Sequence, residues 1–135
     1  MTLQGYLARL ADTLHSRHDI TLEELRLTLT TVGAIFQASA RFYDGSRLLI
    51  VEEVERVSSR DVRRVAYKFH YQRADGTLVF RYDDSPHHPH LSTFPHHRHT
   101  GSSVIEAEAP DLADVLREID ALIYTQPESK MFSSS

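Results

Sequence analysis

The chain has 135 residues and a formal net charge of -4 at pH 7, and it contains nine histidines but no cysteine. The lack of cysteine excludes disulfides, thiolate zinc sites and thiol nucleophiles, and the acidic balance disfavours a protein that coats nucleic acid. The N-terminus does not resemble a signal peptide and no stretch reaches the roughly 20 apolar residues that span a bilayer, so we expect a cytoplasmic protein with no membrane partner.

The first half of the chain predicts one helix followed by strands. Residues 2–16 repeat apolar side chains at spacings of three and four, which indicates an amphipathic helix. Residues 25–30 alternate apolar and polar side chains, as a half-buried strand does. The segments 34–43 and 47–56 flank an Asp-Gly dipeptide, which is typical of a tight hairpin turn. We expect the glutamates near the end of the second segment to be solvated: Glu52, Glu53 and Glu55.

The second half predicts another hairpin, a loop, a short strand and a helix. A second Asp-Gly dipeptide separates residues 65–73 from residues 78–82. In the first of these strands, Tyr67, Phe69 and Tyr71 share one face, which we assign to the core, and the polar side chains of Lys68, His70 and Gln72 share the other. Residues 104–107 form a short strand, and Pro110 opens an amphipathic helix.

Helices at the two ends of the chain with hairpins between them indicate an α+β fold. We expect a single domain over residues 1–125, in which an antiparallel sheet of about five to six strands is flanked by an N-terminal and a C-terminal helix. Residues 126–135 are polar and are expected to form a flexible tail.

The feature with the clearest chemical content is a cluster of histidines. Six of the nine fall within residues 87–99, and the pattern Pro-His-His-x-His at residues 86–90 recurs at residues 95–99. Imidazole has an ordinary pKa of about 6.5, so it can donate, accept or bind a metal near neutral pH. A connection of about twenty residues is longer than most loops, which favours a functional role for this one.

The neighbouring strands add further polar groups to this loop. The strand over residues 78–82 leads the chain into the loop, and His70 lies on the polar face of the strand before it. We expect acid–base residues among His70, His87, His88, His96, His97 and His99. We expect substrate-binding residues among Arg81, Tyr82, Asp83 and Arg98.

One interpretation of the cluster is metal-independent cleavage of RNA. Attack by a 2′-hydroxyl needs a base, an acid and a cation at the phosphorane, and each proton transfer contributes about 10²–10⁴-fold. Two histidines and an arginine supply these groups. On this interpretation the chain is an endoribonuclease that needs no cofactor.

Two other interpretations stay open. His-x-His pairs at positions 88/90 and 97/99 could bind a metal ion together with an aspartate, although their spacing matches no standard zinc template and we expect no resident metal. The histidines could also belong to a non-catalytic module whose ordered loop binds a partner.

Several motifs together resemble the TumE family. These are Tyr-x-Phe-His-Tyr-Gln at residues 67–72, Asp-Gly-x-Leu-x-Phe-Arg-Tyr-Asp at 75–83, Pro-His-His-Pro at 86–89 and Thr-Phe-Pro-His-His-Arg-His at 93–99. The resemblance extends from about residue 25 to residue 123. One departure is Asp84-Ser85, where the family usually has Asn-Ala, so this chain carries an additional negative charge beside the histidines.

The resemblance implies a toxin of a toxin–antitoxin pair whose partner is a helix-turn-helix antitoxin protein. Toxins of this kind commonly attack RNA, so the resemblance favours RNA as the second partner. We therefore predict a toxin that acts on RNA as a metal-independent ribonuclease through its histidine-rich loop, with a non-catalytic partner- or metal-binding module as the alternative. The sequence leaves open whether the chain forms a homodimer.

Overall fold

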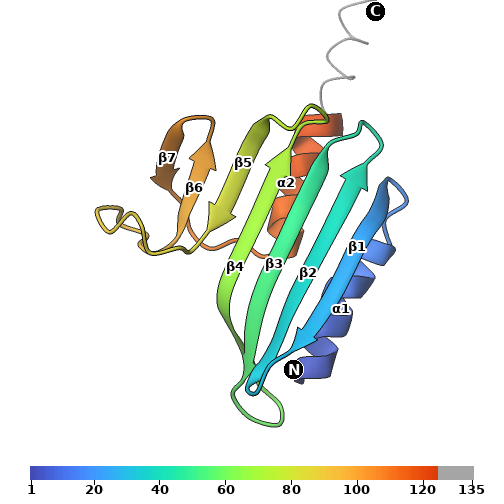
Figure 1. Cartoon of the computed structure of the whole chain (residues 1–135), viewed down its shortest axis with the longest axis vertical. Coiled ribbons are helices and arrows are strands. Elements are labelled where there is room, and N and C mark those ends of the chain that lie inside the picture. The colour runs from blue at the N-terminus through green and yellow to red at the C-terminus, as the bar shows by residue number, and fades with distance from the viewer. Residues whose placement is uncertain (125–135) are drawn as a thin grey trace, which may run out of the picture.

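The computed structural model describes residues 1–124, so the predicted tail at 126–135 lies outside the described residues. The elements are α1 (Leu3–His15), β1 (Ile20–Leu29), β2 (Gly33–Phe42), β3 (Arg47–Arg56), β4 (Val62–Gln72), β5 (Leu78–Asp83), β6 (His97–Thr100), β7 (Ser103–Glu106) and α2 (Leu112–Tyr124). The strands form one antiparallel sheet in chain order from β1 to β7 (Figure 1). This confirms the α+β fold with a helix at each end.

The predicted number of five to six strands is wrong, because the sheet has seven. The additional strand is β6, which lies inside the segment that the sequence predicts to be a loop. Its four residues carry no apolar alternation, and β6 is a strand because it pairs with β5 on one side and β7 on the other. The connection between β5 and β6 is therefore shortened to residues 84–96.

Strand β1 begins at Ile20, five residues before the predicted start, and a β-bulge explains the difference. The pairing with β2 skips from Leu22 to Glu24, so Glu23 is an additional residue on one strand. The bulge shifts the apolar positions from even to odd numbers, from Leu22 to Leu25. Apolar and polar side chains consequently alternate without a break only after the bulge, in the predicted segment 25–30.

Both helices cover the same face of the sheet, as Figure 1 shows. The predicted core side of β4 is confirmed, because Tyr67, Phe69 and Tyr71 are at most 4% exposed. They pack in one cluster with leucines of α1 and with the apolar stripe of α2. The opposite face of the sheet carries no helix in the part of the chain that the structure describes; we call it the open face. Neither described helix is long and apolar enough to cross a membrane.

Glu52 contradicts the prediction that the glutamates near the end of β3 are solvated. Its side chain lies on the helix-covered face and is 1% exposed. The hydroxyl of Tyr6 donates to Glu52 Oε1, and Arg64 Nη1 lies 3.6 Å from Oε2. Burial raises the pKa of Glu52, against the opposing effects of the Tyr6 hydrogen bond and the Arg64 charge.

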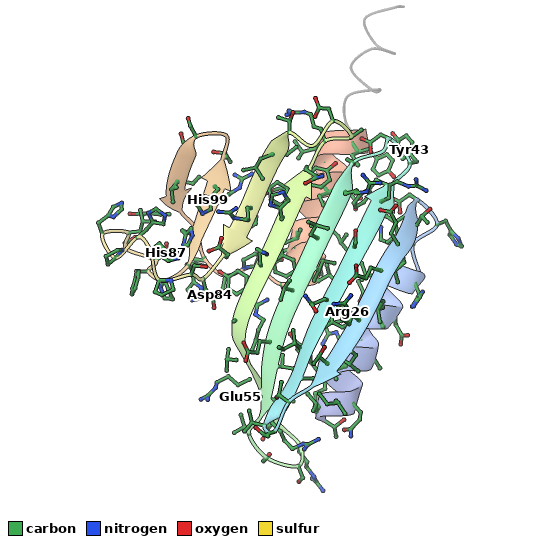
Figure 2. All side chains as sticks on the ribbon, viewed as in Figure 1. Arg26, Tyr43, Glu55, Asp84, His87 and His99 are labelled. Carbon is green, nitrogen blue, oxygen red and sulfur yellow. The ribbon has the colours of Figure 1, made fainter. Side chains whose placement is uncertain are left out.

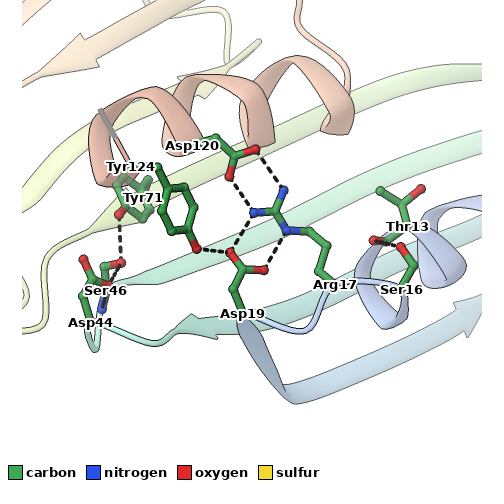
Figure 3. Close-up of polar contacts among 9 residues, drawn as sticks. All are labelled: Thr13, Ser16, Arg17, Asp19, Asp44, Ser46, Tyr71, Asp120 and Tyr124. Carbon is green, nitrogen blue, oxygen red and sulfur yellow. Dashed lines mark hydrogen bonds and ion pairs between the residues drawn. The ribbon is translucent and has the colours of Figure 1, made fainter. Parts of the chain in front are cut away.

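The α2 helix is joined to the start of β1 by an ion network centred on Arg17 (Figure 3). Arg17 donates to Asp120 of α2 over 2.5 Å and to Asp19 over 2.8 Å, and Tyr124 also donates to Asp19, over 2.6 Å. The arginine side chain is 20% exposed. Its hydrogen bonds lower the pKa of Asp19 to about 2. This network links two segments that lie a hundred residues apart in the sequence.

Replacing Arg17 with methionine is expected to lower the free energy of unfolding by about 2 kcal/mol, since two partly buried carboxylates lose a charged donor. The matched control is Arg63→Met, because Arg63 also pairs with a carboxylate but is 67% exposed. The control should change stability by less than about 0.5 kcal/mol. Urea denaturation measures both variants, and equal losses would contradict the role assigned to Arg17.

Candidate active site

The strand register brings six polar side chains together on the open face. His70 of β4 lies opposite Arg81 of β5, which lies opposite His99 of β6. The second row is Lys68, Asp83 and His97. Residues directly opposite one another in antiparallel strands project to the same face, so each row forms a continuous line of side chains across three strands. Figure 2 labels His99 on this part of the sheet, beside the loop that carries His87.

The buried centre of the site is an ion pair between Asp83 and His97. The two side chains are 7% and 2% exposed, and His97 Nε2 lies 2.8 Å from Asp83 Oδ1. The other ring nitrogen, Nδ1, lies 2.9 Å from the carbonyl oxygen of Pro95. Both ring nitrogens of His97 therefore face oxygen atoms, one of a carboxylate and one of a backbone carbonyl.

The hydrogen bonds and charges around Asp83 keep its carboxyl group ionised. Burial raises its pKa, but the hydrogen bond from the Ser85 N–H and the charges of His97 and Arg81 outweigh that effect and hold the pKa below its ordinary value. The carboxylate therefore organises the site by accepting from the Ser85 N–H and from Arg81 while it contacts His97. It fixes the direction of both the His97 ring and the Arg81 guanidinium.

His99 faces a different partner from His97, the guanidinium of Arg81. Arg81 Nε donates to Asp83 Oδ2 over 3.0 Å, and Arg81 Nη2 lies 3.1 Å from His99 Nε2. A guanidinium can only donate, so His99 Nε2 accepts and carries no proton. Burial lowers the pKa of His99, and the charge of Arg81 lowers it further. The ring centroids of His97 and His99 lie 4.8 Å apart.

His70 lies on the other side of Arg81 from His99. Its Nε2 is 3.1 Å from Gln72 Oε1. Burial lowers the pKa of His70 by more than the hydrogen bond with Gln72 raises it, and the charges of Arg81 and Lys68 lower it further. Two strand spacings separate the backbones of His70 and His99 by about 10 Å, which leaves room for a phosphate group bound to Arg81 between the two rings.

The loop contributes His88 to this cluster. The ligand atoms of His88, His97 and His99 lie within 4.8 Å of one another, the one such metal-ligand grouping found in residues 1–124. Three imidazoles suit zinc, nickel or copper. A metal ion here would have to replace the bond of His97 to Asp83 and the bond of His99 to Arg81, so the existing hydrogen bonds compete with metal binding.

The structure places other predicted site residues away from the open face. The Tyr82 hydroxyl and Arg98 Nη2 donate to Glu118 of α2 over 2.7 and 3.0 Å. His96 stacks on Tyr67, with its Nδ1 3.0 Å from the Tyr67 hydroxyl. These three side chains hold the sheet, the loop and α2 together. His87 is exposed in the loop.

Asp84, the departure from the TumE pattern, also lies off the open face. Its Oδ1 accepts from the backbone N–H of Tyr67 over 3.2 Å. An asparagine side chain could accept the same hydrogen bond. The additional negative charge therefore adds no group to the two rows of the candidate site.

Lys68 is the one residue of the two rows that we did not predict from the sequence as part of the site. It is exposed and lies opposite Asp83. Its position two residues before His70, on the polar face of the same strand, is the signal that could have identified it. Strand alternation alone places the two side chains on one face.

Comparison with known proteins adds one finding. The model of a family described as "Toxin TumE" matches residues 8–123, a segment that contains every residue of the two rows. No curated protein and no solved structure matches the chain.

Proposed function

This chain belongs to the TumE family of toxins, and from that premise we propose that it inhibits growth by cleaving RNA with the side chains of the open face. The observation that carries the proposal is the row His70, Arg81 and His99, in which a permanent cation lies between two imidazoles. A toxin of this kind has an antitoxin partner. We further propose that the partner is a helix-turn-helix protein and that both act in the cytoplasm.

The proposed reaction is transesterification within the RNA backbone. Neutral His99 takes the proton of the 2′-hydroxyl, whose oxygen forms a bond to the adjacent phosphorus while the bond from phosphorus to the 5′-oxygen breaks. Arg81 turns from His99 Nε2 to the phosphate and stabilises the phosphorane with its planar pair of donors. His70, whose protonated form is favoured beside the bound phosphate, gives a proton to the leaving 5′-oxygen.

Asp83 and His97 act as positioning residues in this proposal. His97 is 2% exposed and both its ring nitrogens are engaged, so it does not reach the substrate. The Asp83 carboxylate aims Arg81 at the row of reacting groups, and His97 holds that carboxylate in place. Before the substrate binds, the hydrogen bond from Arg81 keeps His99 Nε2 free of a proton and ready to accept one.

The test is RNA cleavage by the purified chain in the presence of excess chelator. We expect full activity, with 2′,3′-cyclic phosphate and 5′-hydroxyl ends, because the mechanism uses only side chains. Loss of activity on chelation, with recovery on adding one equivalent of a divalent ion, would contradict the proposal. Induced expression with and without the neighbouring antitoxin gene, followed by analysis of total RNA, tests the same activity in cells.

The second candidate function is a non-catalytic module that binds a metal or a partner through the loop. The proximity of His88, His97 and His99 favours it. It would replace the first if the chain cleaves no RNA, binds one Ni²⁺ or Zn²⁺ ion tightly by calorimetry, and loses that binding in His88→Ala.

A further inference from the structure

The outer edge of β1 is unpaired in the described part of the chain. β1 is ten residues long and ends the strand order of the sheet, with only β2 beside it. Leu25, Leu27 and Leu29 project from its helix-covered face and are 41%, 47% and 74% exposed. A long edge strand with an apolar side normally receives a partner or a protecting charge on that side.

A groove follows this edge between β1 and α1. It has a volume of about 500 Å³, and its walls include the three leucines of β1 together with Leu7 and Ala11 of α1. Figure 1 shows α1 running behind β1 at this end of the sheet. The groove is therefore open on the side where a further strand would add to the sheet.

We propose that this edge pairs with β1 of a second copy of the chain, antiparallel about a two-fold axis at Leu25. In that register Glu24 lies opposite Arg26 of the partner subunit, and Arg26 lies opposite the partner's Glu24. Both residues are on the open face and are at least half exposed, and pairing between subunits would exchange the contact of 3.4 Å that Arg26 Nη2 makes with Glu24 Oε1 of its own chain. Opposite charges in directly opposed positions stabilise a strand pair.

The bulge at Glu23 extends this match to the rest of the strand. It adds one residue on each copy, so beyond it Leu27 lies opposite Leu22 of the partner subunit and Leu29 lies opposite the partner's Ile20. On the open face, Thr28 lies opposite the partner's Thr21. Apolar side chains thus meet apolar ones along the groove, and polar side chains meet polar ones.

Charge also selects this register over its neighbours. A two-residue shift of one strand against the other keeps the leucines on one face and moves the axis to Arg26 or to Glu24, which places two like charges directly opposite each other. A symmetric pairing about a point between two residues would turn the leucines toward the open face of the partner. The register about Leu25 avoids both penalties.

The proposed dimer goes beyond the proposed function and does not depend on it. β1 is at the opposite end of the strand order from β5 and β6. Pairing through β1 therefore leaves the candidate site of each copy uncovered. Variants that separate the subunits should keep whatever activity each chain has.

The test is the molar mass of the full chain in solution, measured by light scattering across a concentration series. We expect twice the chain mass of 15.5 kDa. Glu24→Arg and Arg26→Glu should each raise the dissociation constant at least tenfold, because each places like charges opposite one another. The double charge swap should restore the dimer, and Arg63→Glu serves as a control distant from β1. A monomer for the unsubstituted chain, or no recovery in the double variant, would overturn the proposal.

Disulfide trapping tests the register, since the chain has no cysteine of its own. Leu25→Cys should cross-link to its own copy under mild oxidation, because directly opposed residues have the Cα separation that a disulfide needs. Leu29→Cys should not. Cross-linking of the second variant alone would overturn the register. If the chain alone is a monomer and β1 becomes protected from hydrogen exchange only when the antitoxin is added, the edge belongs to the antitoxin and the dimer proposal is wrong.

Discussion

Replacing His99 with alanine is expected to lower the rate of RNA cleavage by about 10²–10⁴-fold, the typical contribution of one proton transfer. The imidazole is the neutral acceptor beside Arg81, so its removal takes away the proposed base. Stability should change little, because the side chain is partly exposed and Arg81 still pairs with Asp83. The measurements are single-turnover cleavage of a defined RNA and thermal unfolding of both proteins.

The matched control is the double variant His15→Ala/His18→Ala, which removes histidines near the end of α1, away from the site. It should cleave RNA at the original rate. In the unsubstituted protein the acidic limb of the pH–rate profile should have its midpoint below pH 6.5, because burial and the charge of Arg81 lower the pKa of His99. Undiminished cleavage by His99→Ala would exclude this residue as the base.

Replacing Asp83 with asparagine is expected to lower the free energy of unfolding by about 3 kcal/mol, the typical cost of removing one partner from a buried ion pair. The amide is neutral, and its NH₂ group must face either His97 Nε2 or the Arg81 guanidinium in place of a carboxylate oxygen. RNA cleavage should also fall, because Arg81 loses the group that aims it. Urea denaturation at pH 7 and cleavage rates measure the two effects separately.

The control for that variant is Asp84→Asn, one residue further along the chain. The Asp84 side chain accepts a single hydrogen bond from the Tyr67 N–H, which an amide oxygen can also accept. Its stability should stay within about 1 kcal/mol of the original. Equal losses in the two variants would contradict the special role of Asp83.

Acid should reduce the difference between Asp83→Asn and the unsubstituted protein. The pKa of Asp83 is lowered in the folded state from an unfolded value of 3.8. Its stabilising effect is therefore fully present above pH 3.8 and is lost as the pH falls toward the lowered value. A difference in stability that stays constant from pH 7 to pH 3 would show that ionisation of Asp83 contributes nothing.

Local patterns in the sequence were sufficient to predict most of the elements and one face of the candidate site. Asp-Gly turns determined two hairpins, and alternation in β4 correctly separated the core residue Tyr67 from His70. For the same reason, Arg81 and Asp83 lie on one face of β5 and Tyr82 lies on the other. Successive side chains along a strand point to opposite faces, so odd-numbered and even-numbered residues separate without knowledge of the rest of the fold.

Pairing between strands determined the surroundings of the histidines, which alternation along a single strand could not predict. Histidine repeats indicated a loop, yet His97 and His99 lie on a strand because β5 and β7 supply hydrogen-bond partners on both sides. The same pairing sends His96 to the helix-covered face, where it stacks on Tyr67, and turns its neighbour His97 toward Asp83. Adjacent histidines in one motif thus have unrelated surroundings.

By itself the sequence determined the fold class, the family and the kind of chemistry available, because turn residues, periodicity and histidine content are local properties. Only the tertiary structure decided which imidazoles share a site and which partner each of them faces. His97 Nε2 faces the Asp83 carboxylate and His99 Nε2 faces the Arg81 guanidinium, and both of these partners lie on the neighbouring strand β5. The register of β5 against β6, a contact between segments separated by a loop, fixes that choice.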